Sequence, residues 1–423
     1  MKVLIMSAST GGGHKRASAA LKKYILEQSD KNEVVIIDAI EECSKFLNFT
    51  ITKGYHALAT KIPELYGTFY ETSDKDTALG DLLNGVNSQY GTKLLPIIEK
   101  INPDIIVSCH AFATKMCSVL KCDYGMKIPV VGIVTDFMPH RSYIGEKIDA
   151  YITPSDETTQ VLSDKYGIDK DTIYTFGIPI FEQFYQVDEE AKEKLLTDMG
   201  LDPKKKTVLV MAGSFGVSDI LKIYENLVEI DIDYQIIVIT GRNQKLYDVF
   251  ERLIQRDNED PTLQNAPDFI YQMSEDNIIK QFYQQNETFK QTIDSTFKHP
   301  SSHSKPTKLL YFIENVDDYM RASDFIITKP GGLTTSESLA CCLPMVIYQA
   351  FPGQEAQNAE FLTKNNMAIM LKEDKEGQEQ IKELLTNDDA LQKMKNACKT
   401  FAKPKSCEKL YFLLEEITSK KGE

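Results

Sequence analysis

One stretch of this 423-residue chain indicates the fold most clearly: Thr328-Lys329-Pro330-Gly331-Gly332-Leu333-Thr334-Thr335-Ser336-Glu337-Ser338-Leu339. An apolar run enters two glycines, and a helical pattern follows from about Thr334. This succession is typical of parallel α/β proteins that hold an anion at a helix N-terminus. Two interpretations are open. Thr334 and Glu337 match a capping box. Alternatively, a diphosphate lies on Gly331, Gly332 and Thr334 while Glu337 binds the two ribose hydroxyls. Only the second explains the glycines.

Short apolar runs alternate with helical patterns on both sides of this stretch, as in parallel sheets covered by helices on both faces. The runs are Val3–Ala8, Val34–Ala39, Asp104–Cys109, Pro129–Thr135, Ala150–Thr153, Ile173–Ile180, Thr207–Ala212, Tyr234–Thr240, Leu309–Ile313, Phe325–Thr328 and Met345–Tyr348. They predict two doubly wound, Rossmann-like domains facing each other across a cleft. The expected boundaries are 1–185, 186–405 with an insertion at about 255–307, and a terminal helix at 406–423.

Composition and charge exclude several classes. The formal net charge of −14 argues against nucleic acid as a partner. The 8 cysteines form no CxxC pair, so we expect reduced, buried thiols and no metal site. No run approaches the ~20 apolar residues of a transmembrane helix. A strand that begins directly after Met1 leaves no room for a signal peptide, so we expect a cytoplasmic protein.

A glycine-rich turn follows the first predicted strand and ends in a histidine, Gly11-Gly12-Gly13-His14. Glycines there allow a tight turn and close approach of the backbone to a ligand. The pattern is neither GxGxxG nor a P-loop. A plain tight turn is one interpretation. The other is that Gly12 and Gly13 contact substrate and that His14 is a general base for a hydroxyl.

Two further motifs follow strands of the second half. Gly213 and Ser214 suit a phosphate-binding loop or a simple turn. Gln354, Glu355 and Asn358 form a set of hydrogen-bonding side chains suited to sugar hydroxyls, although polar residues at a helix start are the alternative. Because strand ends of one parallel sheet open towards the same edge, we expect the 354–358 motif to lie near the Gly331-Gly332 turn.

Together these motifs resemble the family of monogalactosyldiacylglycerol synthases and processive diacylglycerol glucosyltransferases, distant relatives of the GlcNAc transferase that acts on lipid I. The matching pieces run in family order over nearly the whole chain: Gly11 to His14, Val134 to Phe137, Phe176 to Pro179, Gly213-Ser214, Thr328 to Glu337, and Pro352 to Asn358. The resemblance implies a GT-B fold, a UDP-hexose donor, inversion at the anomeric carbon, and neither metal nor cofactor.

The resemblance also implies roles for single residues. His14 and Asp136 are candidates for activating the acceptor hydroxyl, and Ser214 for contacting the diphosphate. Acceptor or membrane contacts are implied for an aromatic segment and for the residues that follow Asp136, where Tyr143 stands in place of the family's Trp: Phe46, Phe49, Tyr66, Phe69, His140 and Tyr143. The implied partners are diacylglycerol or a similar lipid and the cytoplasmic face of the membrane, to which the protein would attach peripherally.

Two other functions remain open. One is transfer from a UDP-sugar to another lipid or polyprenyl acceptor. The other is a non-catalytic regulator that binds UDP-sugar. The sequence does not distinguish a glucose from a galactose donor, because both sugars present similar hydroxyls to Gln354 and Glu355.

Overall fold

The computed structural model describes residues 1–8, 12–43, 63–74, 92–185, 189–211, 217–259 and 305–420, together with a few single positions between 280 and 291. Phe46, Phe49, Gly213 and Ser214 lie outside the described residues, as does most of the expected insertion at 255–307. Tyr66 and Phe69 belong to a described helix, but their side chains are not described.

The first half contains a six-stranded parallel sheet in the order β2-β1-β3-β4-β5-β6. Its strands are β1 (Lys2–Ser7), β2 (Glu33–Asp38), β3 (Ile105–Ser108), β4 (Val130–Ile133), β5 (Ala150–Ile152) and β6 (Ile173–Tyr174). Its helices are α1 (Gly12–Gln28), α2 (Ala39–Cys43), α4 (Pro63–Ser73), α6 (Leu95–Ile101), α7 (Ala111–Asp123) and α8 (Asp156–Tyr166).

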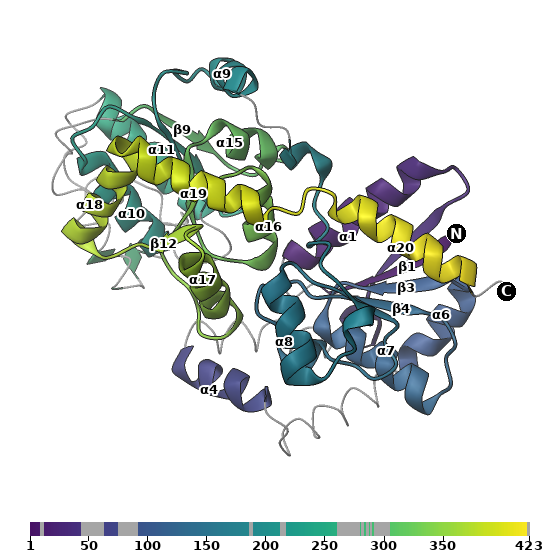
Figure 1. Cartoon of the computed structure of the whole chain (residues 1–423). Coiled ribbons are helices and arrows are strands. Elements are labelled where there is room, and N and C mark those ends of the chain that lie inside the picture. Colours follow the sequence, from purple (N-terminus) through teal and green to yellow (C-terminus); the bar gives the residue numbers. More distant parts are fainter. Residues whose placement is uncertain are drawn as a thin grey trace.

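The second half repeats this plan as a separate layered unit (Figure 1). Its strand order is β12-β11-β10-β7-β8-β9. Its strands are β7 (Thr207–Met211), β8 (Gln235–Ile239), β9 (Thr307–Leu310), β10 (Phe325–Thr328), β11 (Met345–Ile347) and β12 (Ala368–Met370). Its helices are α9 (Glu189–Asp198), α10 (Val217–Glu229), α11 (Gln244–Glu259), α15 (Val316–Ala322), α16 (Gly332–Ala340), α17 (Gln354–Lys364), α18 (Asp374–Thr386) and α19 (Asp388–Phe401). The predicted pair of doubly wound sheets is confirmed, and β12 is a strand that the sequence pattern did not reveal.

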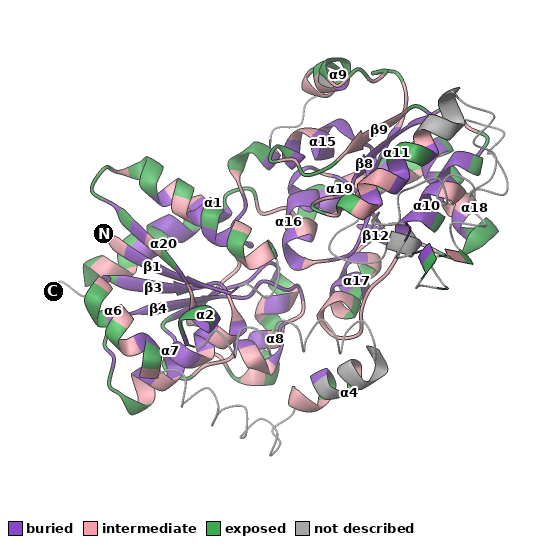
Figure 2. Cartoon of the chain, turned by 180° about the vertical axis from the view of Figure 1, so that it is seen from behind, coloured by how far each residue is buried: buried purple, intermediate pink, exposed green. Residues whose placement is uncertain are grey.

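Each sheet is buried on both faces, which explains why its strands are almost uniformly apolar (Figure 2). Alternate side chains of β1 enter different cores: Val3 and Ile5 pack on one face, Leu4 and Met6 on the other. This is the two-residue period of a strand. The apolar runs of the sequence therefore record a sheet sandwiched between helices.

The strand order places two switch points at the carboxyl edges of the sheets. In the first sheet the order reverses between β1 and β3, and in the second between β10 and β7. Open α/β sheets bind ligands where the strand order reverses, outside the carboxyl ends. The loop that leads to His14 follows β1, and the Gly331-Gly332 turn follows β10. Topology thus places the two strongest sequence motifs at the expected ligand-binding edges.

The chain returns to the first half after α19. Helix α20 (Ser406–Lys420) lies beside α1, and Leu410, Leu413 and Leu414 join the core that contains Val3 (Figure 1). The first half is therefore built from both ends of the chain. In the part of the chain that the structure describes, no helix combines the length and the apolar character that a membrane crossing requires.

Replacing Leu414 with Ala is expected to lower the free energy of unfolding by about 2–5 kcal/mol, because a fully buried leucine leaves a cavity. Phe412 lies on the same helix and is 58% exposed, so Phe412→Ala is the matched control and should change stability by about 0.5 kcal/mol or less. Urea unfolding monitored by circular dichroism measures both. Equal losses in the two variants would show that α20 does not complete the core.

Candidate functional site

The starts of helices α1 and α16 meet where the two halves of the chain touch. A Cβ atom on Gly13 would lie 3.4 Å from Cβ of Leu333, which is ordinary contact. A Cβ atom on Gly332 would lie 1.8 Å from the carbonyl oxygen of Thr135, a distance that no side chain tolerates. Glycine at position 332 thus allows the start of α16 to approach the loop after β4. We call this contact region, formed by residues 12–16, 135–137 and 330–337, the seam.

The capping-box interpretation of Thr334 and Glu337 is wrong. Helix α16 begins at Gly332, its N-cap is Gly331, and no side chain caps it. Thr334 lies half-buried in the first turn, and Glu337 is buried further along the helix. The helix begins two residues earlier than the pattern predicted, at a glycine whose Cβ position is taken by the Thr135 carbonyl. The alternative role, contact with a diphosphate and ribose, remains a prediction.

His14 lies in the first turn of α1, and the contacts of its ring show which nitrogen carries the proton. Its Nδ1 is 2.8 Å from the carbonyl oxygen of Cys109 and 3.4 Å from Oγ1 of Thr135. A carbonyl oxygen only accepts, so Nδ1 carries the proton and Nε2 is the basic nitrogen. Burial lowers the pKa of His14, against the opposing effects of Asp136 and the Cys109 carbonyl. His14 is therefore neutral at neutral pH and fit to accept a proton.

A second imidazole, that of His110, packs against His14. The rings of His14 and His110 meet edge to face, with centroids 4.7 Å apart. His110 precedes α7, and its Nδ1 accepts the N–H of Phe112, so its proton lies on Nε2. Burial and the neighbouring His14 hold the pKa of His110 well below its usual value. Sequence reasoning missed His110, although its position directly beyond strand β3 is the signal that would have found it.

Asp136, Tyr143 and Thr135 form a buried hydrogen-bonded chain beside His14. The hydroxyl of Tyr143 donates to Oδ2 of Asp136 at 2.8 Å and accepts from Thr135 at 2.7 Å. Burial raises the pKa of Asp136, while its hydrogen bonds and the nearby His14 oppose that shift. Burial, together with Asp136, also raises the pKa of Tyr143. The structure connects Asp136 to His14 through Tyr143 and Thr135.

The side chain of Asn358 bridges the two halves. Its Oδ1 accepts the N–H of Phe137 at 2.9 Å, and its Nδ2 donates to Oδ1 of Asp136 at 3.3 Å and to the carbonyl of Pro330 at 3.0 Å. The residue is 1% exposed. A buried amide is satisfied by such partners, and losing one leaves an unpaired polar group. The predicted contact of Asn358 with a sugar is not seen here and remains a prediction.

Glu337 forms the other polar contact across the seam. Its Oε1 lies 3.0 Å from a guanidinium nitrogen of Arg16, two residues beyond His14 on α1. Burial raises the pKa of Glu337 to about 7, even though Arg16 opposes the shift, and Asp317 adds to it. Sequence reasoning missed Arg16, because an arginine near the start of a helix is usually exposed to solvent.

Charged and polar groups surround the start of α16 from the neighbouring strand ends. The ammonium of Lys329 lies 4.1 Å from the centroid of the Phe351 ring. Glu355 accepts the N–H of Phe351 at 3.0 Å, and burial raises the pKa of Glu355. Gln354 is half-buried at the start of α17. The buried Oγ1 of Thr335, in the first turn of α16, has no hydrogen-bond partner among the described residues, so a polar ligand there would satisfy it.

The residues predicted for the acceptor side are engaged within the protein. His140 lies between α4 and the loop after β4: its Nε2 is 3.0 Å from the carbonyl of Tyr70, and its Nδ1 accepts the N–H of Ser142. Tyr70 also donates to Gln357 of α17 at 3.3 Å, so α4 contacts both halves. Tyr143 is buried in the chain described above. Contact of His140 or Tyr143 with a lipid remains a prediction.

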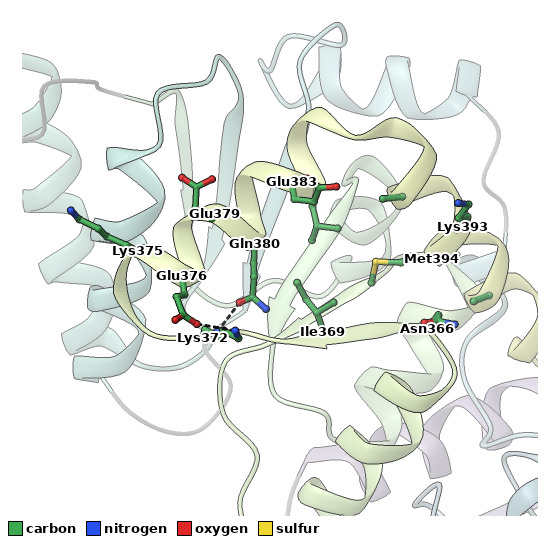
Figure 3. Close-up of a pocket in the computed structure, with 13 residues that line it drawn as sticks. Asn366, Ile369, Lys372, Lys375, Glu376, Glu379, Gln380, Glu383, Lys393 and Met394 are labelled. Carbon is green, nitrogen blue, oxygen red and sulfur yellow. Dashed lines mark hydrogen bonds and ion pairs between the residues drawn. The ribbon is translucent and has the colours of Figure 1, made fainter.

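A hollow of about 1030 Å³ opens away from the seam, between β12, α18 and α19 (Figure 3). Its floor is apolar, with Ile369 and Met394, and its rim carries charges of both signs, including Lys372 and Glu383. None of the chemically suited residues at the seam lines it. Size alone is thus a poor guide, and we place the candidate site at the seam. Among the described residues, no group of three or more His, Cys, Asp or Glu is arranged to hold a metal ion.

Comparisons with known proteins show what each half of the chain resembles. Residues 14–180 match the family described as monogalactosyldiacylglycerol (MGDG) synthase, and residues 247–410 match the glycosyltransferase family 28 C-terminal domain. The chain is 27% identical over 407 residues to a processive diacylglycerol beta-glucosyltransferase of Bacillus cereus, covering 95% of this chain and 90% of that protein. Among solved structures, MurG of Acinetobacter baumannii superposes with a TM-score of 0.59 at 13% identity, covering 98% of this chain and 99% of that one. UDP-GlcNAc 2-epimerase of Neisseria meningitidis, bound to UDP-GlcNAc, superposes with a TM-score of 0.56 at 12% identity, covering 98% and 100%.

The paired sheets and the family matches define a glycosyltransferase of the GT-B class. The chain is similar over most of its length to the monogalactosyldiacylglycerol synthases and processive diacylglycerol glucosyltransferases. Its first half matches the synthase family and its second half the family 28 domain.

Replacing Gly332 with Ala is expected to force the seam apart, because the new methyl group would collide with the backbone of Thr135. We expect a loss of about 1–3 kcal/mol in the free energy of unfolding, measured by chemical denaturation, and a larger radius of gyration by X-ray scattering. Gly331→Ala is the matched control, since a methyl group there meets open space and the backbone conformation suits alanine. Indistinguishable behaviour of the two variants would contradict the close packing of the seam.

Proposed function

We propose that the protein transfers a hexose from a UDP-hexose to the hydroxyl of diacylglycerol, or of its glycosylated form, with inversion at the anomeric carbon. The names of the family and of the relative support the lipid acceptor. The observation that carries the chemistry is the tautomer of His14, whose Nδ1–H is committed to the Cys109 carbonyl and whose Nε2 is therefore basic. We further propose that the lipid reaches the site from a membrane surface to which the protein attaches peripherally.

The reaction is a single displacement. The lipid hydroxyl oxygen attacks the anomeric carbon of the donor, and the bond from that carbon to the diphosphate oxygen breaks. Nε2 of His14 takes the hydroxyl proton, while Asp136 stabilises the resulting imidazolium through its charge. The product is a glycolipid, and UDP departs with the electron pair of the broken bond.

The departing diphosphate needs positive charge, and the start of α16 provides it. The first backbone N–H groups of a helix have no partners within the helix and carry a partial positive charge. At Gly331 nothing lies within 4 Å of where a Cβ atom would be, which leaves room for a ligand beside these amides, whereas the same space at Gly332 is taken by the Thr135 carbonyl. Lys329 adds a buried ammonium nearby. We assign the ribose hydroxyls to Glu337 and the sugar hydroxyls to Gln354, Glu355 and Asn358. In the sequence, Gly213 and Ser214 follow β7, the neighbour of β10, which supports their assignment to the diphosphate.

The direct test is UDP release by the purified protein from UDP-glucose and, separately, UDP-galactose, with and without diacylglycerol micelles, followed by lipid chromatography. We expect UDP release that depends on the lipid, together with a new glycolipid whose sugar identifies the donor. UDP release without a new glycolipid would support the assignment of a UDP-hexose as donor and reject diacylglycerol as the acceptor. Binding of UDP without release from either donor would favour a regulator.

Replacing His14 with Ala is expected to lower the transfer rate by about 10²–10⁴-fold and to leave UDP affinity unchanged, because His14 acts on the acceptor proton. Lys15 is exposed on the same turn of α1, so Lys15→Ala is the control and should retain the rate of the unmodified protein. Calorimetric titration with UDP supplies the affinity. A His14→Ala variant that retains its transfer rate would exclude His14 as the base.

The pH dependence of kcat at saturating donor is expected to report the same group. Since burial lowers the pKa of His14 below 6.5, the neutral base prevails at pH 7 to 8 and kcat should be flat there. Below the pKa, protonation removes the base and kcat should fall about tenfold per pH unit. A rate that rises on acidification through pH 6 would contradict a neutral histidine base.

A further inference from the structure

Arg16 holds the carboxylate to which the donor ribose is assigned. The guanidinium of Arg16 and Oε1 of Glu337 are 3.0 Å apart and belong to different halves of the protein. The Glu337 side chain is only 5% exposed, whereas that of Arg16 is 40% exposed. The arginine can therefore swing towards solvent with little loss of packing, while the glutamate cannot. Any ligand that takes this carboxylate has to displace the arginine.

Arg16 also stabilises the negative charge of Glu337, because the surroundings of this carboxylate disfavour it. On α15, Asp317 lies near Glu337 and disfavours its negative charge, and Cys341 is the C-cap of the helix that carries Glu337. Arg321 is the nearby cation on α15, but Asp317 binds it at 3.4 Å and Asp318 at 2.6 Å. A buried carboxylate next to another carboxylate takes up a proton unless a cation compensates. In this neighbourhood the compensation comes from α1.

We infer that Arg16 is a positioning residue for the nucleotide: before UDP binds it keeps Glu337 ionised, and so ready to accept hydrogen bonds from both ribose hydroxyls, and it is exchanged for the ribose when UDP binds. The inference rests on the proposed function, because it takes UDP as the ligand of Glu337. A carboxylate accepts both hydroxyls of a ribose, whereas a protonated carboxyl group has lost part of its accepting capacity. Arg16 acts on the nucleotide through Glu337. Because Arg16 and His14 are both near the start of α1, replacing the arginine by the ribose on Glu337 alters the seam beside the base.

The experiment is calorimetric titration of UDP into the full-length protein and three variants, Arg16→Gln, Arg16→Lys and Glu337→Gln, from pH 5.5 to 9.5. Titration of the UDP phosphate is common to all four proteins, and Glu337→Gln supplies the baseline without a titrating carboxyl group. Relative to that baseline, UDP affinity of the unmodified protein should fall as the pH drops through about 7. In Arg16→Gln the pH at the midpoint of this fall in UDP affinity should rise by about one unit or more. In Arg16→Lys the midpoint should return to that of the unmodified protein.

The outcomes separate this inference from the proposed function. At pH 9.5, Arg16→Gln should bind UDP at least as tightly as the unmodified protein, because the ribose has lost its competitor. Equal midpoints in Arg16→Gln and the unmodified protein would overturn the inference and leave UDP as the ligand. A loss of affinity in Arg16→Gln that is the same at every pH would overturn it in favour of a direct phosphate contact. Failure of the unmodified protein to bind UDP would reject the donor assignment and the inference together.

Discussion

The buried amide of Asn358 is the contact on which the geometry of the site depends. It belongs to α17 of the second half, yet it satisfies the backbone N–H of Phe137 in the first half and reaches Asp136 and the Pro330 carbonyl. Hydrogen bonds of this kind have narrow distance limits, so the loop after β4 and the turn before α16 have one relative placement. The absence of a side chain on Gly332 makes that placement sterically possible. The two sheets thereby present their carboxyl edges to one another.

The same seam controls the ionisation of the residues that would do the chemistry. His14, Asp136 and Glu337 all have pKa values shifted towards the neutral form, chiefly by burial. A neutral histidine is what proton acceptance requires, so for His14 burial serves the reaction. For the two carboxyl groups, burial opposes the charged form, and partners compensate: Tyr143 and Asn358 for Asp136, and Arg16 for Glu337. Two of these compensating groups come from the opposite half, so the charges at the site depend on the halves being together.

Much of this arrangement follows from the sequence, and the remainder has identifiable physical reasons. Apolar runs followed by glycines placed the His14 turn and the Gly331-Gly332 turn at strand ends, and the strand order brought them to ligand-binding edges. The start of α16 was misjudged because the sequence pattern indicated a side-chain cap at Thr334, whereas the N-cap is Gly331 and no side chain caps the helix. Arg16, His110 and the bridging use of Asn358 escaped prediction because their partners lie far along the chain, and a single sequence carries no record of such pairs. The three-residue strand β12 was too short to show a period.

The most direct test of this account is a crystal structure of the protein with UDP. The account predicts the uracil nucleotide at the seam, with its ribose hydroxyls on Glu337, its diphosphate at the start of α16, and the Arg16 guanidinium moved away from Glu337. It also predicts that the bond from His14 Nδ1 to the Cys109 carbonyl persists, since the base must keep its tautomer. UDP bound elsewhere, for example in the hollow between α18 and α19, or UDP at the seam with the Arg16–Glu337 pair intact, would contradict the account.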